Sequence, residues 1–256
     1  MPRHVDVWID GIRLQDAEPL AKVRQLTEDV PALEVTAAAP VGWDGQRAPM
    51  IRRRSLRVTL AAQIHEVYDL ARRSQAAENI AAWAQGQLLT VSYRPGRRLR
   101  VKLTKAPSIG KARDYTQEIT AEWTAFEVPY WEDEIERIYR GTNGTSGTVN
   151  LWQAGSKAAP VDAEIIPAAA LSALTLTCGG ESLVFSFAAP VAAGTVIRIG
   201  HTGEDWLTAA AGESSILTSL QPQSADILTA QPGHNEATWT ADASCEVTLR
   251  TRGRYE

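Results

Sequence analysis

The sequence predicts a mainly β protein of two domains: an α+β N-terminal domain with one helix and a C-terminal antiparallel β-sandwich. Short runs that alternate apolar and polar residues occur throughout the chain, as in half-buried strands. Only one stretch has helical spacing. A segment of small and polar residues divides the 256 residues, a length that fits two ordinary domains. We therefore expect an N-terminal domain over 1–140, a linker over 141–149 and a C-terminal domain over 150–256.

The opening residues predict a β-hairpin. Apolar residues take alternate positions at Val5, Val7 and Ile9, and Asp10-Gly11 follows them. Asp-Gly between strand-like runs favours a type I′ turn, in which both central residues have positive φ. Residues 20–49 are less regular, and we expect loops there around one short strand at Leu33–Thr36.

The one helical stretch begins near Glu66. Apolar residues then recur at helical spacing as far as Ala84, and Gly86 is expected at the C′ position just after the helix. Ser74 would cap a second segment if the stretch is broken in two.

Antiparallel strands surround this helix in the prediction. The residues of 56–60 alternate, and a second hairpin is expected from 88–93 to 98–104 through Arg94-Pro95-Gly96-Arg97, where Pro then Gly favours a type II turn. A long alternating strand over 115–126 closes this α+β half.

The second half has only strand signals. Gly141 to Thr148 includes no large apolar side chain to offset the entropy of ordering, which indicates a linker. Gly179-Gly180 predicts a tight hairpin. About seven short strands in roughly 100 residues indicate a β-sandwich. They are expected at 161–166, 173–178, 183–187, 195–199, 215–220, 236–240 and 245–251.

The charge argues against a nucleic-acid binder. Residues 1–140 have 21 basic and 19 acidic side chains, and residues 141–256 have 5 and 11. A net charge near +2 in the first half is far from the strongly basic domain that nucleic acid requires. We expect the arginines to form salt-bridged contacts between subunits. They are Arg52, Arg53, Arg54, Arg57, Arg94, Arg97, Arg98 and Arg100.

No residue pattern predicts a catalytic, cofactor-binding or metal site. The four histidines are scattered without a partner at metal-ligand spacing, and no nucleophile elbow, phosphate-binding loop or dinucleotide-binding glycine pattern occurs. The acidic run Glu132–Glu136 is expected to be a solvated face. Cys178 and Cys245 are expected to be reduced thiols in strands. No apolar run is long enough to span a membrane, and we expect no secretion signal at the N-terminus.

The eight tryptophans are many for a chain with three phenylalanines. We expect Trp83, Trp123, Tyr130 and Trp131 in the core or at an interface. Trp152, Trp206 and Trp239 leave an alternative open, because β-sandwiches commonly bind glycans through exposed tryptophan.

Several of these segments resemble the distal tail protein (Dit) family of phages with long, non-contractile tails. The similar features are the opening strand–Asp-Gly–strand, the order of strand, helix and Arg94-Pro95-Gly96 hairpin, and Val128-Pro129-Tyr130-Trp131 between the domains. Near the C-terminus, Gln231-Pro232-Gly233-His234-Asn235 leads to Trp239 and the strand from Cys245, again as in that family. The Ala-rich segments 168–170 and 188–193 depart from it.

The resemblance implies a ring-forming "belt" domain followed by a galectin-like β-sandwich. It implies a structural protein of the virion tail tip that is encoded by a phage or a prophage and assembled in the host cytoplasm. Six copies would form a ring that joins the tail tube protein to the tail-tip hub and leaves a channel for DNA. It implies no enzyme activity and no cofactor.

Two other functions remain open. One is a cell-surface glycan-binding module, which an exposed Trp206 or Trp239 beside polar side chains would favour. The other is a hydrolase without a recognisable motif, which a pocket of converging acid and base groups would favour.

Overall fold

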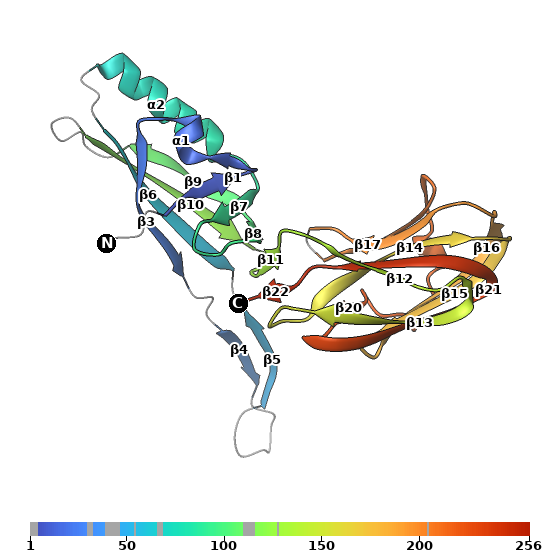
Figure 1. The fold of residues 1–256 in the computed structure, drawn as a ribbon. Helices are drawn as coiled ribbons and strands as arrows, with labels where there is room; N and C mark the ends of the chain where they lie inside the picture. Colours follow the sequence, from blue (N-terminus) through green and yellow to red (C-terminus); the bar gives the residue numbers. More distant parts are fainter. Residues whose placement is uncertain are drawn as a thin grey trace. The chain divides into compact units, whose positions relative to one another are not determined.

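The computed structural model describes residues 5–29, 33–38, 47–53, 55–65, 69–109, 116–126, 128–203 and 205–256 (Figure 1). The chain divides into two compact units, Met1–Trp131 and Glu132–Glu256. Strands dominate both units, the sheets are antiparallel, and the described residues form two α-helices. The predicted mainly β fold class is confirmed.

The first sheet of unit 1 begins with the predicted hairpin. Strands β1 (Val7–Ile9) and β2 (Ile12–Arg13) pair through Ile9 and Ile12. Asp10 has φ 49° and Gly11 has φ 79°, as a type I′ turn requires.

Strands β7 (Leu88–Val91) and β8 (Arg97–Arg100) extend this sheet. They are joined by the predicted turn, in which Gly96 has φ 71° and the Arg97 amide donates to the Arg94 carbonyl at 3.2 Å. The expected strand over 98–104 is divided, because the chain leaves β8 at Arg100 and enters another sheet at Lys102.

The second sheet of unit 1 has four strands. Their order is β3 (Ala21–Asp29), β6 (Leu56–Ile64), β10 (Gln117–Ala125) and β9 (Lys102–Ile109). β6 buries every second residue, as its alternation predicts. β3 lies where we expected loops. It is an edge strand with few buried side chains, so its sequence has little apolar alternation. β4 (Leu33–Ala38) and β5 (Arg47–Arg53) form a separate two-stranded ribbon (Figure 1).

The main helix of unit 1 is α2 (Leu70–Trp83). Asp69 caps it by accepting the Ala71 amide at 2.9 Å, and the helix is unbroken, so the second segment that Ser74 would have capped does not form. Gly86 is not the C′ residue, since the helix ends at Trp83 with Ala84 as its C-cap. A Cβ on Gly86 would lie 2.3 Å from Cγ2 of Ile9, so close packing against β1 requires glycine. The four-residue helix α1 (Leu14–Ala17) was not predicted.

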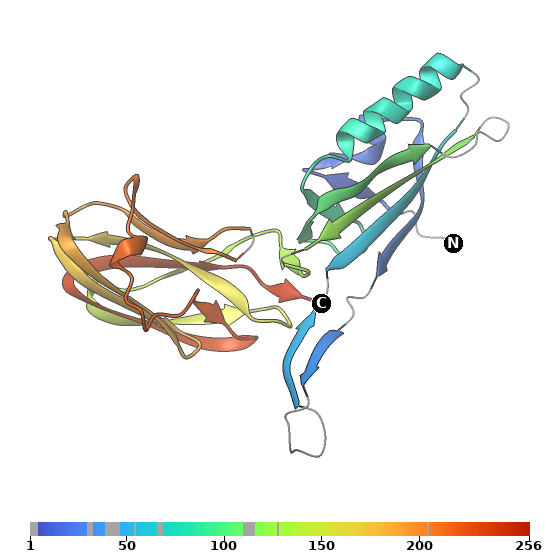
Figure 2. The same ribbon diagram turned by 180° about the vertical axis from the view of Figure 1, so that it is seen from behind.

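Unit 2 is a layered antiparallel structure (Figure 2). Its strands are β12 (Arg137–Arg140), β13 (Gly144–Gln153), β14 (Ala159–Pro167), β15 (Leu171–Cys178), β16 (Glu181–Val191), β17 (Ile197–His201), β18 (Leu207–Ala211), β19 (Ser214–Ser215), β20 (Thr229–Ala230), β21 (Gly233–Thr251) and β22 (Arg254–Tyr255). β11 (Trp131–Asp133) crosses the boundary between the units.

The 19-residue strand β21 organises unit 2. Its first half pairs with β13 and β15, and its second half pairs with β12 and β14. Alternate side chains from β13 to β18 and from β21 meet in one apolar core, so the strands fold over that core as two facing layers. We had expected two strands with a break near Asp242. The chain continues because Asp242 turns outward and its carboxylate accepts the Ser172 and Ala173 amides.

The linker expected over 141–149 is wrong. Most of this segment belongs to β13, which pairs with β21 from Gly147↔Trp239 to Gln153↔Gly233. Its glycines are packing positions, because a Cβ on Gly147 would lie 2.1 Å from the Trp239 ring and one on Gly141 would lie 2.5 Å from it. The division into units lies earlier, after Trp131.

Three other expectations for unit 2 have clear outcomes. The strand expected at 215–220 is wrong, since Leu217–Ser219 forms a 3-10 turn. Gly179 and Gly180 have φ 61° and 86° in the predicted hairpin between β15 and β16. Cys178 and Cys245 are free, buried and in strands, as expected. None of the helices in the described ranges is long and apolar enough to cross a membrane.

Candidate functional site

The arginines predicted to link subunits include some that are used within unit 1. Arg57 pairs with Glu122 at 3.3 Å, and Arg94 pairs with Glu28 at 3.1 Å. Arg97 and Arg98 also have interactions within the structure. The side chains of Arg52 and Arg53, and all of Arg54, lie outside the described residues.

Glu28 is the centre of a cluster at the end of unit 1. It accepts hydrogen bonds from Arg94, from the Tyr93 hydroxyl and from Nε1 of Trp131, the last at 3.1 Å. Arg94 also lies over the Trp131 ring, 5.1 Å from its centroid. Burial and the neighbouring Glu28 carboxylate raise the pKa of Tyr93. This cluster fixes Trp131, the last residue of the unit.

Trp83 and Trp123 are in the core of unit 1, as predicted, whereas Tyr130 is only partly buried. Trp83 and Trp123 meet edge to face at 5.9 Å between ring centroids. Their indole N–H groups donate to the carbonyls of Ile12 and Ala84, each at 2.8 Å.

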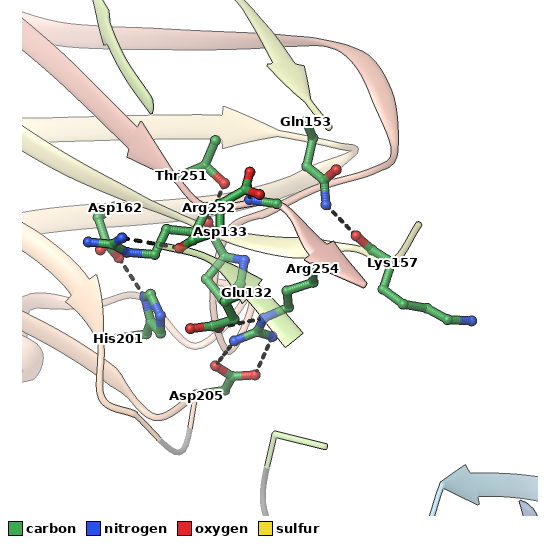
Figure 3. A network of polar contacts seen from close by, with 12 residues as sticks. Glu132, Asp133, Gln153, Lys157, Asp162, His201, Asp205, Thr251, Arg252 and Arg254 are labelled. Carbon is green, nitrogen blue, oxygen red and sulfur yellow. Dashed lines mark hydrogen bonds and ion pairs between the residues drawn. The ribbon is translucent and has the colours of Figure 1, made fainter. Parts of the chain in front are cut away.

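The acidic run at the start of unit 2 meets the C-terminal strand in a polar network (Figure 3). Arg254 is 5% exposed and donates to Glu132 at 3.0 Å and to both oxygens of Asp205 at 2.6 and 2.7 Å. Asp133 accepts the Tyr255 hydroxyl and the Gly253 amide. The expected solvated face is therefore wrong for Glu132 and Asp133.

The Arg254 network is structural. Burial alone would lower the pKa of Arg254, but the hydrogen bonds and charges of Asp205 and Glu132 outweigh it and raise the pKa. The bidentate pair fixes Asp205, which has φ 60°. Sequence reasoning missed this pair, because 49 residues separate its members and no local pattern links them.

The structure brings together one histidine and one carboxylate. Nδ1 of His201 lies 2.7 Å from Oδ1 of Asp162, between the paired strands β17 and β14 (Figure 3). In the described part of the chain, no three His, Cys, Asp or Glu side chains lie close enough together to ligate a metal.

The three tryptophans of unit 2 have different environments. Trp239 is buried at 2% exposure, so it offers no platform for a glycan. Trp152 is 44% exposed and its ring meets His234 edge on. Trp206 is 69% exposed and lines a pocket of about 660 Å³ together with Leu207, Leu217, Leu220, Gln221, Pro222, Ser224 and Asp226.

The loop that presents Trp206 is held at several points. The Thr202 amide donates to the Trp206 carbonyl at 2.8 Å, and the Trp206 amide donates to Oγ1 of Thr202 at 3.2 Å. The adjacent Asp205 is anchored by the buried Arg254. The exposed indole therefore lies at the edge of a pocket, beside described residues, Thr202 and Asp205, that are held by hydrogen bonds.

Comparison of folds gives a clear result. The SPP1 Dit protein, described as a paradigm of the hub adsorption apparatus in phages that infect Gram-positive bacteria, superposes with a TM-score of 0.73. The match covers 98% of this chain and 99% of that chain at 13% identity. The fold is that of a phage distal tail protein.

A second match is a chain of the phage P2 baseplate in its activated, calcium-containing conformation. Its TM-score is 0.53 at 8% identity, over 99% of this chain and 98% of that chain. No protein-family model matches the sequence, and no curated protein matches it. The Dit-like fold is thus detected over both units by structure, at an identity too low for sequence comparison.

Proposed function

We propose that this protein is a structural component of a phage tail tip. It forms a ring, most simply of six copies, that joins the tail tube protein to the tail-tip hub and leaves a channel for DNA. The observation that carries this proposal is the match to the SPP1 Dit hub protein across both units. The match covers nearly the full length of both chains, so it includes both units and is not limited to one common domain.

We assign ring formation to unit 1 on the basis of charge. Residues 1–131 have 19 basic and 15 acidic side chains, whereas residues 132–256 have 7 and 15. Copies of a mixed-charge surface attract one another when opposite charges face across the contact. Copies of unit 2 would be repelled by its excess of acidic residues.

Native mass spectrometry and multi-angle light scattering of the full chain test the ring. A closed oligomer with six-fold symmetry in electron micrographs supports it, because a part that caps a tube shares the symmetry of the tube. A monomer at high concentration, without rings in micrographs, would overturn the proposal.

Separate expression of residues 1–131 and 132–256 tests the assignment of roles. We expect the first to assemble and the second to be a monomer. Assembly of the second alone would reverse the assignment. The tail tube and hub proteins are the expected partners on the two faces of the ring, and co-purification with each tests that expectation.

A further inference from the structure

We propose that the pocket beside Trp206 is a binding site for a neutral saccharide, with one pyranose ring stacked on the indole. The inference does not rest on ring formation or on a place in a tail tip. It rests on four features of unit 2: the exposed indole of Trp206, the pocket beside it, the hydrogen bonds that hold the neighbouring backbone, and the charge of the pocket lining.

The exposure of Trp206 is the first feature. A large aromatic side chain gains free energy from burial, and Trp206 forgoes most of that gain at 69% exposure. A pyranose ring has one face of C–H bonds and a rim of hydroxyl groups. A flat indole beside hydrogen-bonding side chains complements that shape.

The pocket supplies those side chains. Its volume of about 660 Å³ lies in the range of small-ligand sites, roughly 300–1,000 Å³. Leu217 and Leu220 form an apolar wall, and Gln221 and Asp226 add an amide and a carboxylate. The amide both donates and accepts, and the carboxylate accepts, which suits hydroxyl groups that do both. Within the described chain, neither of these two side chains has a hydrogen bond or ion pair.

The bracing of the loop lowers the cost of binding. The Trp206 backbone is held by Thr202, and the neighbouring Asp205 is held by its pair with the buried Arg254. A ligand that stacks on an indole whose backbone is already ordered does not have to order that backbone when it binds. The Asp205 carboxylate is occupied by Arg254, so Asp205 is a positioning residue and not a saccharide ligand.

The charge of the site selects a neutral ligand. The described lining has no Lys, Arg or His, and because Asp205 is paired with Arg254, the carboxylate that faces a ligand without a cationic partner is that of Asp226. Unit 2 as a whole has 15 acidic and 7 basic side chains. Uronic acids, sialic acids and phosphorylated polymers would be repelled, whereas neutral hexoses and N-acetylhexosamines would not.

Binding of the full-length protein to a saccharide array is the first test. The array presents neutral hexopyranosides and N-acetylhexosamines, with uronic-acid and sialic-acid saccharides as the anionic arm. Titration calorimetry with the strongest soluble binder, at up to about 10 mM, then detects millimolar dissociation constants. We expect binding from the neutral arm.

Matched variants locate the site. Trp206→Ala should weaken binding at least about tenfold, while Trp152→Ala, which removes the other exposed tryptophan of the unit, should leave it unchanged. Asp205→Asn should weaken binding several-fold by freeing the loop. Circular dichroism and the unfolding midpoint establish that each variant is folded.

Three results would overturn the proposal. They are no binding to any neutral saccharide, equal binding by Trp206→Ala and the wild type, and a preference for the anionic arm. If Trp206→Ala instead abolishes association with another protein and no saccharide binds, the pocket is a protein-docking surface and the inference is wrong. The ring assay above is independent, so failure of one proposal is distinguishable from failure of the other.

Discussion

Trp239 explains why two positions in the segment that we expected to be a linker are glycines. Its buried ring lies against Gly141 and Gly147, where any Cβ would overlap it. Neither glycine has a positive φ, so the requirement is space and not backbone freedom. Packing against Trp239 therefore requires glycine at both positions, whereas a flexible linker has no such requirement.

The first prediction concerns this contact. Gly147→Ala should lower the free energy of unfolding of unit 2 by about 1–3 kcal/mol, because the new methyl group overpacks the Trp239 ring. Thr148→Ala, at the exposed neighbouring position, should change it little. In the double variant Gly147→Ala with Trp239→Phe, the smaller ring should make room for the new methyl group. Part of the lost free energy of unfolding should then be restored. Urea denaturation measures all three, and a neutral Gly147→Ala would contradict the packing.

Glu18 provides a second residue-scale prediction. Its side chain is fully buried and accepts hydrogen bonds from Arg72 at 2.5 and 3.0 Å and from Asn79 at 3.0 Å. Burial alone would raise the pKa of Glu18. The opposite effect is larger, because Arg72, Asn79 and the Leu20 amide donate hydrogen bonds to the carboxylate and Arg72 adds its positive charge. The pKa of Glu18 therefore lies below its usual value of 4.5. The stabilisation is therefore complete above pH 4.5 and is lost as the pH falls through the lower, folded-state pKa.

Glu18→Gln should therefore destabilise unit 1 by about 1–3 kcal/mol at pH 7, with a loss that shrinks below pH 4.5 as the wild-type carboxyl becomes protonated. Denaturant titrations from pH 7 to pH 3 give this difference directly. Glu118→Gln, on an exposed position of β10, is the control. A difference that stays constant with pH would show that packing, not charge, is responsible.

At the scale of elements, local patterns predicted the hairpins and the main helix. Asp10-Gly11, Gly96 and Gly179-Gly180 each require positive φ, and a turn of that kind is encoded within a few residues. We predicted that the helix begins near Glu66, because the residues before Asp69 also have helical spacing. In the structure α2 begins after Asp69, which is its N-cap. The edge strand β3 was missed because an edge strand buries few side chains and needs little alternation.

Long-range pairing accounts for the remaining differences. β13 is a strand because β21, some ninety residues later in the sequence, supplies its partner, and nothing within residues 141–149 encodes that pairing. The Trp206 pocket was predictable only as far as its tryptophan. The pair that anchors the neighbouring Asp205 joins it to Arg254, and these two residues are 49 positions apart in the sequence.

Limited proteolysis tests the strand assignment of β13. A broad-specificity protease at low concentration should not make its first cut within Gly141–Gly147, because the segment is paired with β21 and packed on Trp239. Mass spectrometry of the earliest fragments locates the cut. A first cleavage there would restore the linker interpretation.

At the scale of the whole molecule, each unit has a core of its own. One cluster of buried residues lies entirely in unit 2, and Trp83, Trp123 and Trp131 are buried in unit 1. Separate cores allow separate cooperative unfolding.

Differential scanning calorimetry should therefore resolve two transitions. Glu18→Gln should lower the midpoint of one and Gly147→Ala the midpoint of the other, by roughly 3–8 °C for a change of about 1 kcal/mol in units of this size. The wild-type trace is the reference. A single transition that both variants shift equally would mean that the units unfold as one.

The length of β21 also has a consequence for synthesis on the ribosome. Both layers of unit 2 are completed by this one strand, whose partners β12, β13, β14 and β15 are all made earlier. Until Thr251 leaves the ribosome, those strands have unpaired edges and an uncovered apolar face. Unit 1 is complete 120 residues earlier, at Trp131. The core of unit 2 can therefore close only after this late strand has been synthesised.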